Sequence, residues 1–349
     1  MLKPWLKRLT SGGDLSRRDA ARAMDIIMDG AADDAQIAAF AVALRMKGET
    51  AEEITGCAQA LRRRAEKISP GSRLAAKLVD TCGTGGDSLG TINVSTLSAF
   101  VAAGAGLPVA KHGNRSVSSR CGSADLLEAL GVPIDLPPAE VQTCLERTGL
   151  AFLFAPRFHP ALRHAVGARR SLGVRTIFNL LGPLCNPAGA RLQLMGVYDA
   201  SRLRTMARVL AALGARRALV VRGHDGMDEL TVTGKTAVMD LRNGSIRART
   251  WAPEDVGLRR WRLAALQGGD PEQNAAAALA VLEGGRGAAR DVTLFNAGAA
   301  LLIGGAASTL REGVAQARES IDSGRARDKL EEVRAFCLAS QNAVRPGPS

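Results

Sequence analysis

The sequence predicts an α/β protein in which a small all-helical domain precedes a larger domain with a central, mainly parallel sheet. Residues 1–68 show helical patterns throughout, whereas short apolar runs alternate with helical patterns from Leu78 onward. This alternation is typical of βαβ units, whose crossover helices return the chain to a parallel neighbouring strand. The length of 349 residues agrees with about two domains.

Helix-start signals within the first 68 residues support the helical domain. Ser16 with Asp19 resembles a capping box, in which a side chain accepts a hydrogen bond from the backbone three residues later. Thr50 with Glu53 forms the same pattern as Thr-x-x-Glu. The helix-breaking run Ser69-Pro70-Gly71 follows, and we place a domain boundary there.

The alternating region defines the expected order of strands and helices. Apolar runs that suit buried strands lie at residues 76–80, 107–110, 150–154, 192–197 and 218–221. Patterns that suit helices lie at residues 95–105, 123–130, 138–148 and 201–213. Residues 160–190 interrupt the alternation with helix-like sequence, which could return to pack on the N-terminal helices. Asn243-Gly244 predicts a hairpin within residues 235–251, and the pattern is helical again from Glu272.

Composition excludes several classes of protein. No stretch reaches the roughly 18 uncharged apolar residues of a membrane helix, and residues 1–9 lack the apolar core of a secretion signal. The six cysteines form no Cys-x-x-Cys pair, and the four histidines show no zinc-ligand spacing. We therefore expect a cytoplasmic protein with reduced cysteines and without a membrane partner.

The net charge of +12 is the one bulk property that favours a nucleic-acid partner. Most of the basic residues are arginines scattered along the chain, and aromatic residues make up only 3% of it. Such a chain lacks the aromatic side chains on which single-stranded bases stack. We therefore expect a solvated basic surface and no nucleic-acid partner.

The most informative segment is the glycine-rich run within residues 80–96. An apolar run ends at Val79, the turn Gly83–Gly86 follows, and a helical pattern begins near Ser95. Glycines let backbone N–H groups approach an anion closely, and a helix N-terminus adds unpaired donors and a favourable dipole. The segment predicts a phosphate-binding loop, although an ordinary glycine turn that caps a helix has the same pattern. It is neither a Walker A loop nor a Gly-x-Gly-x-x-Gly dinucleotide turn.

Further motifs, in order along the chain, indicate a particular family. They are Lys111–Arg115, Gly122–Gly131, Phe154–Pro160, Arg175–Pro187, Gly226–Leu230 and Gln273–Ala276. Together with the loop Gly83–Asp87, these motifs closely resemble the anthranilate phosphoribosyltransferase family from about residue 5 to about residue 330. Several motifs in one order are far more specific than a single glycine turn.

The resemblance implies a reaction, a cofactor and an architecture. The family transfers the phosphoribosyl group of phosphoribosyl pyrophosphate (PRPP) to the amine of anthranilate, with release of pyrophosphate, in tryptophan biosynthesis. It requires Mg2+. The family fold hinges a small helical domain to a larger α/β domain of the nucleoside phosphorylase type, as a homodimer with the active site in the cleft. The resemblance assigns residues 1–70 and the insert 160–190 to the helical domain, and residues 71–159 and 191–349 to the α/β domain.

The resemblance assigns PRPP binding to the glycine-rich loop and the segments that follow it. The residues are Gly83, Thr84, Gly85, Gly86, Asp87, Thr91, Asn93, Ser95, Thr96, Lys111, Ser119 and Ser123. Backbone N–H groups and hydroxyls would hold the phosphates, and Lys111 would add a point positive charge.

The resemblance also implies a magnesium site. Ser95 matches a magnesium-linked position, and Asp228 and Glu229 offer the hard oxygen ligands that suit Mg2+. Because adjacent side chains on a strand point apart, we expect one carboxylate to bind directly and the other through water.

The acceptor site rests on a separate group of residues. The resemblance assigns anthranilate binding to Gly83, His112, Asn114, His159 and Arg169. Arg169 offers a planar fork that suits a carboxylate, although Arg163, Arg170 and Arg175 are nearby alternatives in an arginine-rich chain. No residue is assigned as a general acid or base, because an aromatic amine attacks as the neutral form and loses its proton late or to solvent.

Departures from the family pattern are few, and two other functions remain open. Cys121, Cys185 and Arg222 stand where the family commonly has other residues, and we expect none of them to contact substrate. The enzymatic alternative is a protein like the pyrimidine nucleoside phosphorylases, which share the fold and also act at an anomeric carbon. The other alternative is a paralogue that keeps the fold and binds nucleic acid, which the charge of +12 favours.

Overall fold

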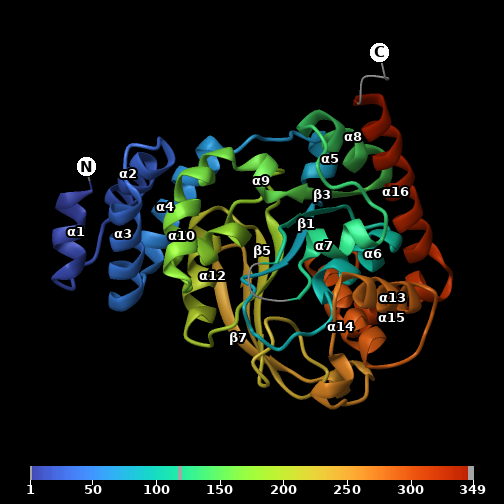
Figure 1. Ribbon diagram of the computed structural model, residues 1–349. Coiled ribbons are helices and arrows are strands. Elements are labelled where there is room, and N and C mark those ends of the chain that lie inside the picture. Colours follow the sequence, from blue (N-terminus) through green and yellow to red (C-terminus); the bar gives the residue numbers. More distant parts are fainter. Residues whose placement is uncertain (1, 117–119, 345–349) are drawn as a thin grey trace.

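Helices cover both faces of a seven-stranded sheet in the computed structural model, which describes residues 2–116 and 120–344 (Figure 1). The N-terminal helices are α1 (Lys3–Thr10), α2 (Arg17–Met28), α3 (Asp34–Lys47) and α4 (Ala51–Arg64). They lie at one end of the molecule, and the helices of the C-terminal third lie at the other.

Capping side chains start these helices where the sequence predicts. The Ser16 side chain accepts a hydrogen bond from the Asp19 N–H (3.1 Å), and the Thr50 side chain accepts one from the Glu53 N–H (3.2 Å). The Glu53 carboxylate returns a contact to the Thr50 N–H (2.8 Å) and pairs with Lys47 (2.9 Å). These bonds satisfy backbone N–H groups that have no partner within the helix, so local sequence sets the helix starts.

The sheet is mainly parallel and ends in an antiparallel hairpin. Its strands are β1 (Val79–Gly83), β2 (Val109–Gly113), β3 (Leu150–Phe154), β4 (Leu192–Gly196), β5 (Arg217–Gly223), β6 (Thr236–Arg242) and β7 (Ser245–Trp251). Their spatial order is β3-β2-β1-β4-β5-β6-β7, with β1 to β5 parallel. Asn243 and Gly244 form the β6–β7 turn with positive φ, as the sequence predicts. The predicted fold class is confirmed.

Two strands continue beyond the apolar runs that predict them. The runs 76–80 and 107–110 predict shorter strands, whereas β1 and β2 extend to Gly83 and Gly113. The residues that extend them include the buried polar residues Thr81, Lys111 and His112. The chemistry-bearing motifs therefore begin inside the sheet and not in the loops after it.

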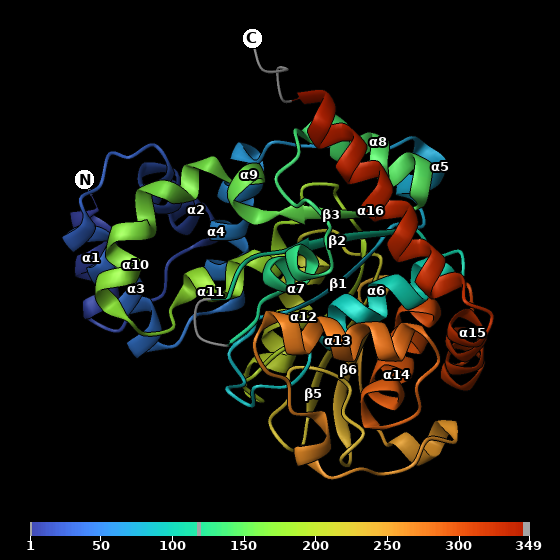
Figure 2. The same cartoon turned by 45° about the vertical axis from the view of Figure 1, so that its right-hand side comes forward.

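Helices pack on the two faces of the sheet in separate groups. On one face α6 (Val94–Gly104) and α14 (Ala288–Gly304) contact the central strands, and on the other α12 (Arg202–Ala212) packs between the sheet and α4. The remaining helices of this part are α5 (Ser72–Ala75), α7 (Ser123–Ala129), α8 (Pro138–Thr148), α9 (Ala155–Phe158), α13 (Pro271–Leu282), α15 (Leu310–Asp322) and α16 (Arg325–Val344). In Figure 2, α16 crosses in front of α6 and α8, which it contacts. Within the described residues, no helix is long and apolar enough to cross a membrane.

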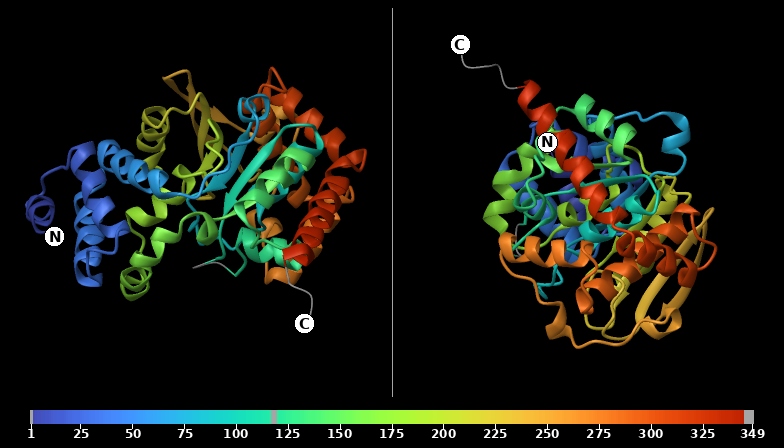
Figure 3. Two further views of the ribbon diagram at one scale, coloured as in Figure 1. Left: turned by 90° about the horizontal axis from the view of Figure 1, so that it is seen from above. Right: turned by 90° about the vertical axis from the view of Figure 1, so that its right-hand side faces the viewer.

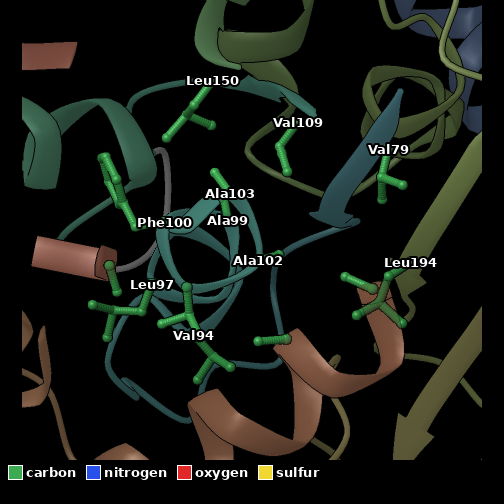
Figure 4. Close-up of a cluster of buried hydrophobic side chains, with 14 of the residues drawn as sticks. Val79, Val94, Leu97, Ala99, Phe100, Ala102, Ala103, Val109, Leu150 and Leu194 are labelled. Atoms are coloured by element: carbon green, nitrogen blue, oxygen red, sulfur yellow. The ribbon is translucent and has the colours of Figure 1, made fainter. Parts of the chain in front are cut away.

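The larger apolar core fixes α6 against the strands. Figure 4 shows Leu97, Ala99 and Phe100 of α6 in one buried apolar cluster with Val79, Val109 and Leu150 of the strands. Each of these residues is at most 4% exposed. Burial of a large apolar side chain stabilises the fold by about 1.5–3 kcal/mol. This packing holds the first turn of α6 beside the carboxyl end of β1.

The helical insert returns to the N-terminal helices. It consists of the 3-10 turns η1 (Pro160–Ala165) and η2 (Gly182–Leu184) and the helices α10 (Val166–Leu172) and α11 (Ile177–Leu181). Its helix-like character is as predicted, and α10 packs on α3 while η1 packs on α2. Figure 3 shows this helical part beside the sheet, on the side opposite the C-terminal helices. Two further 3-10 turns, η3 (Pro253–Val256) and η4 (Leu263–Leu266), lie between β7 and α13.

Candidate active site

A cavity lies at the carboxyl ends of the parallel strands, where the winding of the sheet reverses. β1 pairs with β2 on one side and with β4 on the other. In open α/β sheets, ligands bind in the crevice outside the carboxyl ends of the strands at such a reversal. The cavity has a volume of about 320 Å³, which is within the range of small-molecule sites.

Most of the predicted donor and metal residues line this cavity. They are Gly83, Thr84, Gly85, Gly86, Asp87, Thr91, Asn93, Ser95, Lys111, Ser123, Asp228 and Glu229. From the predicted acceptor residues, Gly83, His112 and Asn114 also contribute. The lining combines the loop after β1, the start of α6, the end of β2 and the loop after β5. The fold thus brings together segments that are far apart in the sequence.

The glycine-rich loop packs directly on Asp228. The Gly85 N–H donates a hydrogen bond to Asp228 Oδ2 (2.9 Å), and the Thr84 N–H donates to the Gly196 carbonyl (2.9 Å). A Cβ at Gly83 would collide with the Asp228 carboxylate, so the close approach itself requires glycine there. Gly86 has a φ of +85°, a conformation that other residues rarely adopt. The shape of the loop therefore depends on the carboxylate beside it.

Lys111 connects the end of β2 to the start of α6. Its Nζ donates hydrogen bonds to the Thr81 carbonyl (2.8 Å) and to Ser95 Oγ (3.1 Å). Lys111 is 4% exposed, and burial lowers the pKa of its ammonium group. The Asn93 side chain donates to the Cys121 carbonyl (3.0 Å), which fixes the start of α6 to the loop before α7. These contacts hold a lysine in the lining where a phosphate would meet a fixed positive charge.

Asp228 and Glu229 lie in a bend after β5, so the expectation of strand geometry for this pair is wrong. Both residues line the cavity. Burial raises the pKa of both carboxyl groups, and the nearby Asp87 carboxylate raises the pKa of Asp228 further. Carboxylates this close to one another repel, and a bound cation would relieve the repulsion.

The donor set suits a magnesium ion bound together with a phosphate ligand. Asp228 and Glu229 offer carboxylate oxygens, and Ser95 offers a hydroxyl. Within residues 2–116 and 120–344, no group of three or more His, Cys, Asp or Glu residues is placed to hold a metal alone. Mg2+ usually keeps several waters and binds one or two carboxylates plus substrate phosphates. The residues present therefore fit Mg2+ that shares its coordination with a substrate.

Two arginines also line the cavity: Arg115, which was not predicted as a site residue, and Arg175, which was named only as an alternative to Arg169 for the acceptor carboxylate. The Arg115 guanidinium pairs with Glu128 and, at 3.3 Å, with Asp125. Arg175 donates from Nη2 to Ser88 Oγ (3.3 Å). Each stands at an end of a recognised motif, Lys111–Arg115 or Arg175–Pro187, and this position is the signal in the sequence that points to both residues.

The two predicted histidines form a buried pair. The rings of His112 and His159 lie 5.0 Å apart between centroids, and the two residues are 5% and 2% exposed. His112 Nδ1 contacts the Gly182 carbonyl (3.1 Å), whereas within the described part of the chain His112 Nε2 has no hydrogen-bond partner. Burial lowers the pKa of His112 to about 3 and that of His159 to about 4. Both rings are therefore neutral at pH 7, and within the described residues His112 Nε2 is a buried ring nitrogen without a hydrogen-bond partner.

Replacing His159 by glutamine is expected to make the free energy of unfolding less dependent on pH between about 4 and 6.5. An unfolded histidine binds its proton near pH 6.5, whereas His159 binds it at about pH 4 in the fold. Between these values the unfolded state holds more protons, so the free energy of unfolding decreases as the pH is lowered through this window. The loss due to His159 would reach about 3 kcal/mol. Urea titrations of wild type and variant across this range would measure it.

The exposed His224 supplies the matched control, because His224→Gln removes a histidine without emptying a buried site. We expect this control to follow the wild-type curve. If His159→Gln followed it as well, the proposed acid sensitivity of His159 would be wrong.

Three of the predicted residues that the structure describes do not line the cavity. Thr96 is 1% exposed and packs inside the fold, and the buried His159 ring contacts the His112 ring. Arg169 is on α10, with its Cζ 5.8 Å from the Phe178 ring centroid, and burial lowers the pKa of its guanidinium. Ser119 lies outside the described residues.

One of the three family departures needs a correction. Cys121 lines the cavity, so the expectation that it stands away from substrate is wrong. Its carbonyl is the acceptor for Asn93, so backbone position and not thiol chemistry explains its place. Cys185 is buried in the helical core, and Arg222 donates from Nε to the Tyr198 carbonyl (2.9 Å); neither is in the lining.

Comparison with known protein families defines the general class. Residues 75–327 match the family described as "Glycosyl transferase family, a/b domain". Residues 3–65 match the family described as "Glycosyl transferase family, helical bundle domain". The helical bundle and the α/β domain of this chain thus match the two domains of a glycosyl transferase family.

Individual relatives narrow this class. The chain is 57% identical to an anthranilate phosphoribosyltransferase of Moorella thermoacetica over 336 residues, which cover 96% of this chain and 98% of the relative. The anthranilate phosphoribosyltransferase structure from Thermus thermophilus is 46% identical, with a TM-score of 0.90 and coverage of 95% and 99%. The chain belongs to the anthranilate phosphoribosyltransferase family.

Solved structures of the Saccharomyces cerevisiae anthranilate phosphoribosyltransferase show what that relative binds. One is a complex with PRPP and Mg, with a TM-score of 0.89 and 29% identity over 97% of this chain and 98% of that one. Another is a complex with 4-fluoroanthranilate, with a TM-score of 0.87 and 28% identity over 97% and 98% of the two chains.

Proposed function

We propose that this protein transfers the phosphoribosyl group of PRPP to the amine of anthranilate, giving N-(5-phosphoribosyl)anthranilate and pyrophosphate, as a step of tryptophan biosynthesis. The observation that supports the proposal most directly is the cavity at the carboxyl end of β1, where the winding of the sheet reverses. There a glycine-rich loop, a buried lysine and two carboxylates meet. Family membership, and relatives solved with PRPP and Mg and with an anthranilate analogue, support the same substrates.

The donor half of the cavity suits displacement at an anomeric carbon. Positive charge spreads over the ribose ring in the transition state while negative charge grows on the leaving pyrophosphate, so preorganised positive groups around the diphosphate lower the barrier. The loop Gly83–Asp87 and the start of α6 at Asn93 and Ser95 would hold the phosphates, with Lys111 fixed between them. When bound, Mg2+ would neutralise part of the diphosphate charge, held by Asp228, Glu229 and Ser95.

The acceptor half would place the amine without a strong protein base. His112 and Asn114 line the cavity, and the neutral His112 ring has one unpaired nitrogen within the described structure. The amine nitrogen attacks as the neutral form and releases its proton to solvent, so placement is the main contribution of the protein. Arg169 would reach the anthranilate carboxylate when the helical part moves toward the α/β part.

Replacing Arg169 by alanine is expected to raise the KM for anthranilate about 10-fold to 100-fold, because a charge-assisted, forked contact to the carboxylate is lost. The KM for PRPP should change far less. Steady-state kinetics with each substrate varied in turn would measure both constants. Arg170→Ala, an exposed neighbour on the same helix, is the control. Equal effects on the two KM values would remove Arg169 from the acceptor site.

The decisive test of the function follows the fluorescence of anthranilate in the presence of PRPP and Mg2+. We expect the signal to decay with pyrophosphate released in step, and the decay to stop when a chelator is added. A folded protein that leaves the fluorescence unchanged would contradict the proposal. Thymidine with phosphate, supplied in parallel, should give no thymine if the phosphorylase alternative is wrong.

We also propose a cytoplasmic homodimer. Met46 on α3 is 83% exposed, and Val166 and Val174 on and after α10 are 46% and 55% exposed. Met46 and Val166 belong to helices that pack together in the helical part, and Val174 follows α10, so a second copy could cover these side chains. Sedimentation equilibrium of wild type and of a Met46→Lys variant would test this, and a monomeric wild type would contradict it.

A further inference from the structure

Arg175 belongs to the helical part of the protein by its main chain. It lies between α10 and α11, in the insert that packs on the N-terminal helices. Its carbonyl accepts a hydrogen bond from Arg45 Nη1 on α3 (2.6 Å). The start of its side chain is therefore held by helices and not by the sheet.

The Arg175 guanidinium, in contrast, lies on the glycine-rich loop of the α/β part. Nη2 donates to Ser88 Oγ (3.3 Å), and Cζ is 4.4 Å from the ring centroid of Tyr198, which follows β4. The guanidinium also covers Gly86, since a Cβ at that position would collide with it. The flat group is thus placed between an aromatic ring and the turn that follows β1, and it lines the cavity.

Within the described residues the charge of Arg175 has no carboxylate partner, in contrast to that of Arg115. Arg115 pairs with Glu128 and Asp125, and Lys111 donates to two oxygen atoms. For Arg175, the polar contact of its guanidinium within residues 2–116 and 120–344 is the single bond to the neutral Ser88 hydroxyl. A guanidinium carries five N–H donors in a fork that matches phosphate oxygens, so most of its hydrogen-bonding capacity is directed to no protein group.

We propose that Arg175 is a substrate-contacting residue that binds the diphosphate of PRPP and stabilises the pyrophosphate as it leaves. This inference rests on the proposed function and adds a cation that the helical insert supplies to the phosphate loop. The bond between the anomeric carbon and the diphosphate oxygen breaks, and its electron pair stays on that oxygen, beside the guanidinium. The amine nitrogen forms the new bond to carbon and gives its proton to solvent. Arg175 stays protonated and charged throughout.

The test compares Arg175→Ala and Arg175→Lys with the control Arg170→Ala, an exposed arginine of the same insert that is not in the lining. Calorimetry with pyrophosphate and Mg2+ gives the affinity for the leaving group without any turnover. We expect Arg175→Ala to weaken pyrophosphate binding about 10-fold to 100-fold and to raise the KM for PRPP by a similar factor. Lysine should recover part of the loss, because it keeps the charge but not the fork.

The KM for anthranilate is the readout that separates contact from structure. It should change by less than about 2-fold in Arg175→Ala, whereas a general distortion of the cleft would alter both substrates. An unchanged affinity for pyrophosphate, or equal losses for both substrates, would overturn the proposal. If the alanine variant unfolds, Arg175→Met keeps the apolar stem against Tyr198 and permits the same measurement. A wild type that binds pyrophosphate but leaves anthranilate untouched would refute the proposed function and not the role of Arg175.

Discussion

Asp228→Asn is expected to lower kcat about 100-fold and to raise the Mg2+ concentration that gives half-maximal activity. Asparagine has almost the same shape, and its carbonyl oxygen can still accept the hydrogen bond that Gly85 donates to Asp228 (2.9 Å). The substitution therefore removes charge while the glycine-rich loop keeps its support. A 100-fold lower rate corresponds to a loss of about 2.7 kcal/mol of transition-state stabilisation, which a metal ligand can supply. Magnesium titrations of the initial rate would measure both effects.

In Asp228→Asn, we expect the affinity for PRPP to decrease less than kcat, each relative to wild type. The loop Gly83–Asp87 and Lys111 remain in place, so ground-state contacts to the phosphates survive. Asp135→Asn, the same change at an exposed site, is the control and should leave the titration unaltered. A magnesium titration of Asp228→Asn that matches wild type would remove this carboxylate from the metal site.

Local sequence patterns were sufficient for most of the fold. The capping residues Ser16 and Thr50 and the turn Asn243-Gly244 act through bonds to their immediate neighbours, so their effects can be read without tertiary knowledge. The ends of β1 and β2 could not be read in this way. These ends include polar residues such as Thr81 and Lys111. They remain in the strands because the fold buries them and supplies hydrogen-bond partners from other segments, as the Lys111 contact to Thr81 illustrates.

The parts of the candidate site that lie within one segment could be predicted from the sequence. The contacts between segments that are distant in the sequence could not. The glycine-rich loop was predicted from its own residues. Nothing local indicates that Arg175 turns toward Gly86, because that approach depends on how the insert packs on α3. Likewise, the sequence could not show that Asp228 and Glu229 lie in a bend. Motif membership identified which residues matter, while direction and distance depend on contacts across the chain.

Lys111→Met is expected to lower kcat/KM for PRPP about 100-fold to 1,000-fold, as loss of one fixed donor to a developing negative charge does in other enzymes. Methionine fills a similar volume, so the cavity should keep its shape. The Lys111 Nζ now donates to the Thr81 carbonyl and Ser95 Oγ, and both would lose this partner. Because we expect Lys111 to contact the phosphates of PRPP and not anthranilate, the KM for anthranilate should change much less. Lys77→Met, at an exposed position, is the control.

The pH dependence of the free energy of unfolding is a second test of Lys111→Met that does not depend on activity. Asp80 is fully buried beside Lys111, and burial raises the pKa of its carboxyl to about 6, against an opposing effect of the lysine charge. A carboxyl whose pKa is raised in the fold holds its proton more tightly there than in the unfolded chain. The free energy of unfolding therefore decreases as the pH rises from about 4 through 6. Without Lys111 the pKa of Asp80 would rise further, so Lys111→Met should lose more stability than wild type over this rise. Urea titrations at both ends of the range would measure the difference, and parallel curves would show that Lys111 does not compensate the charge of Asp80.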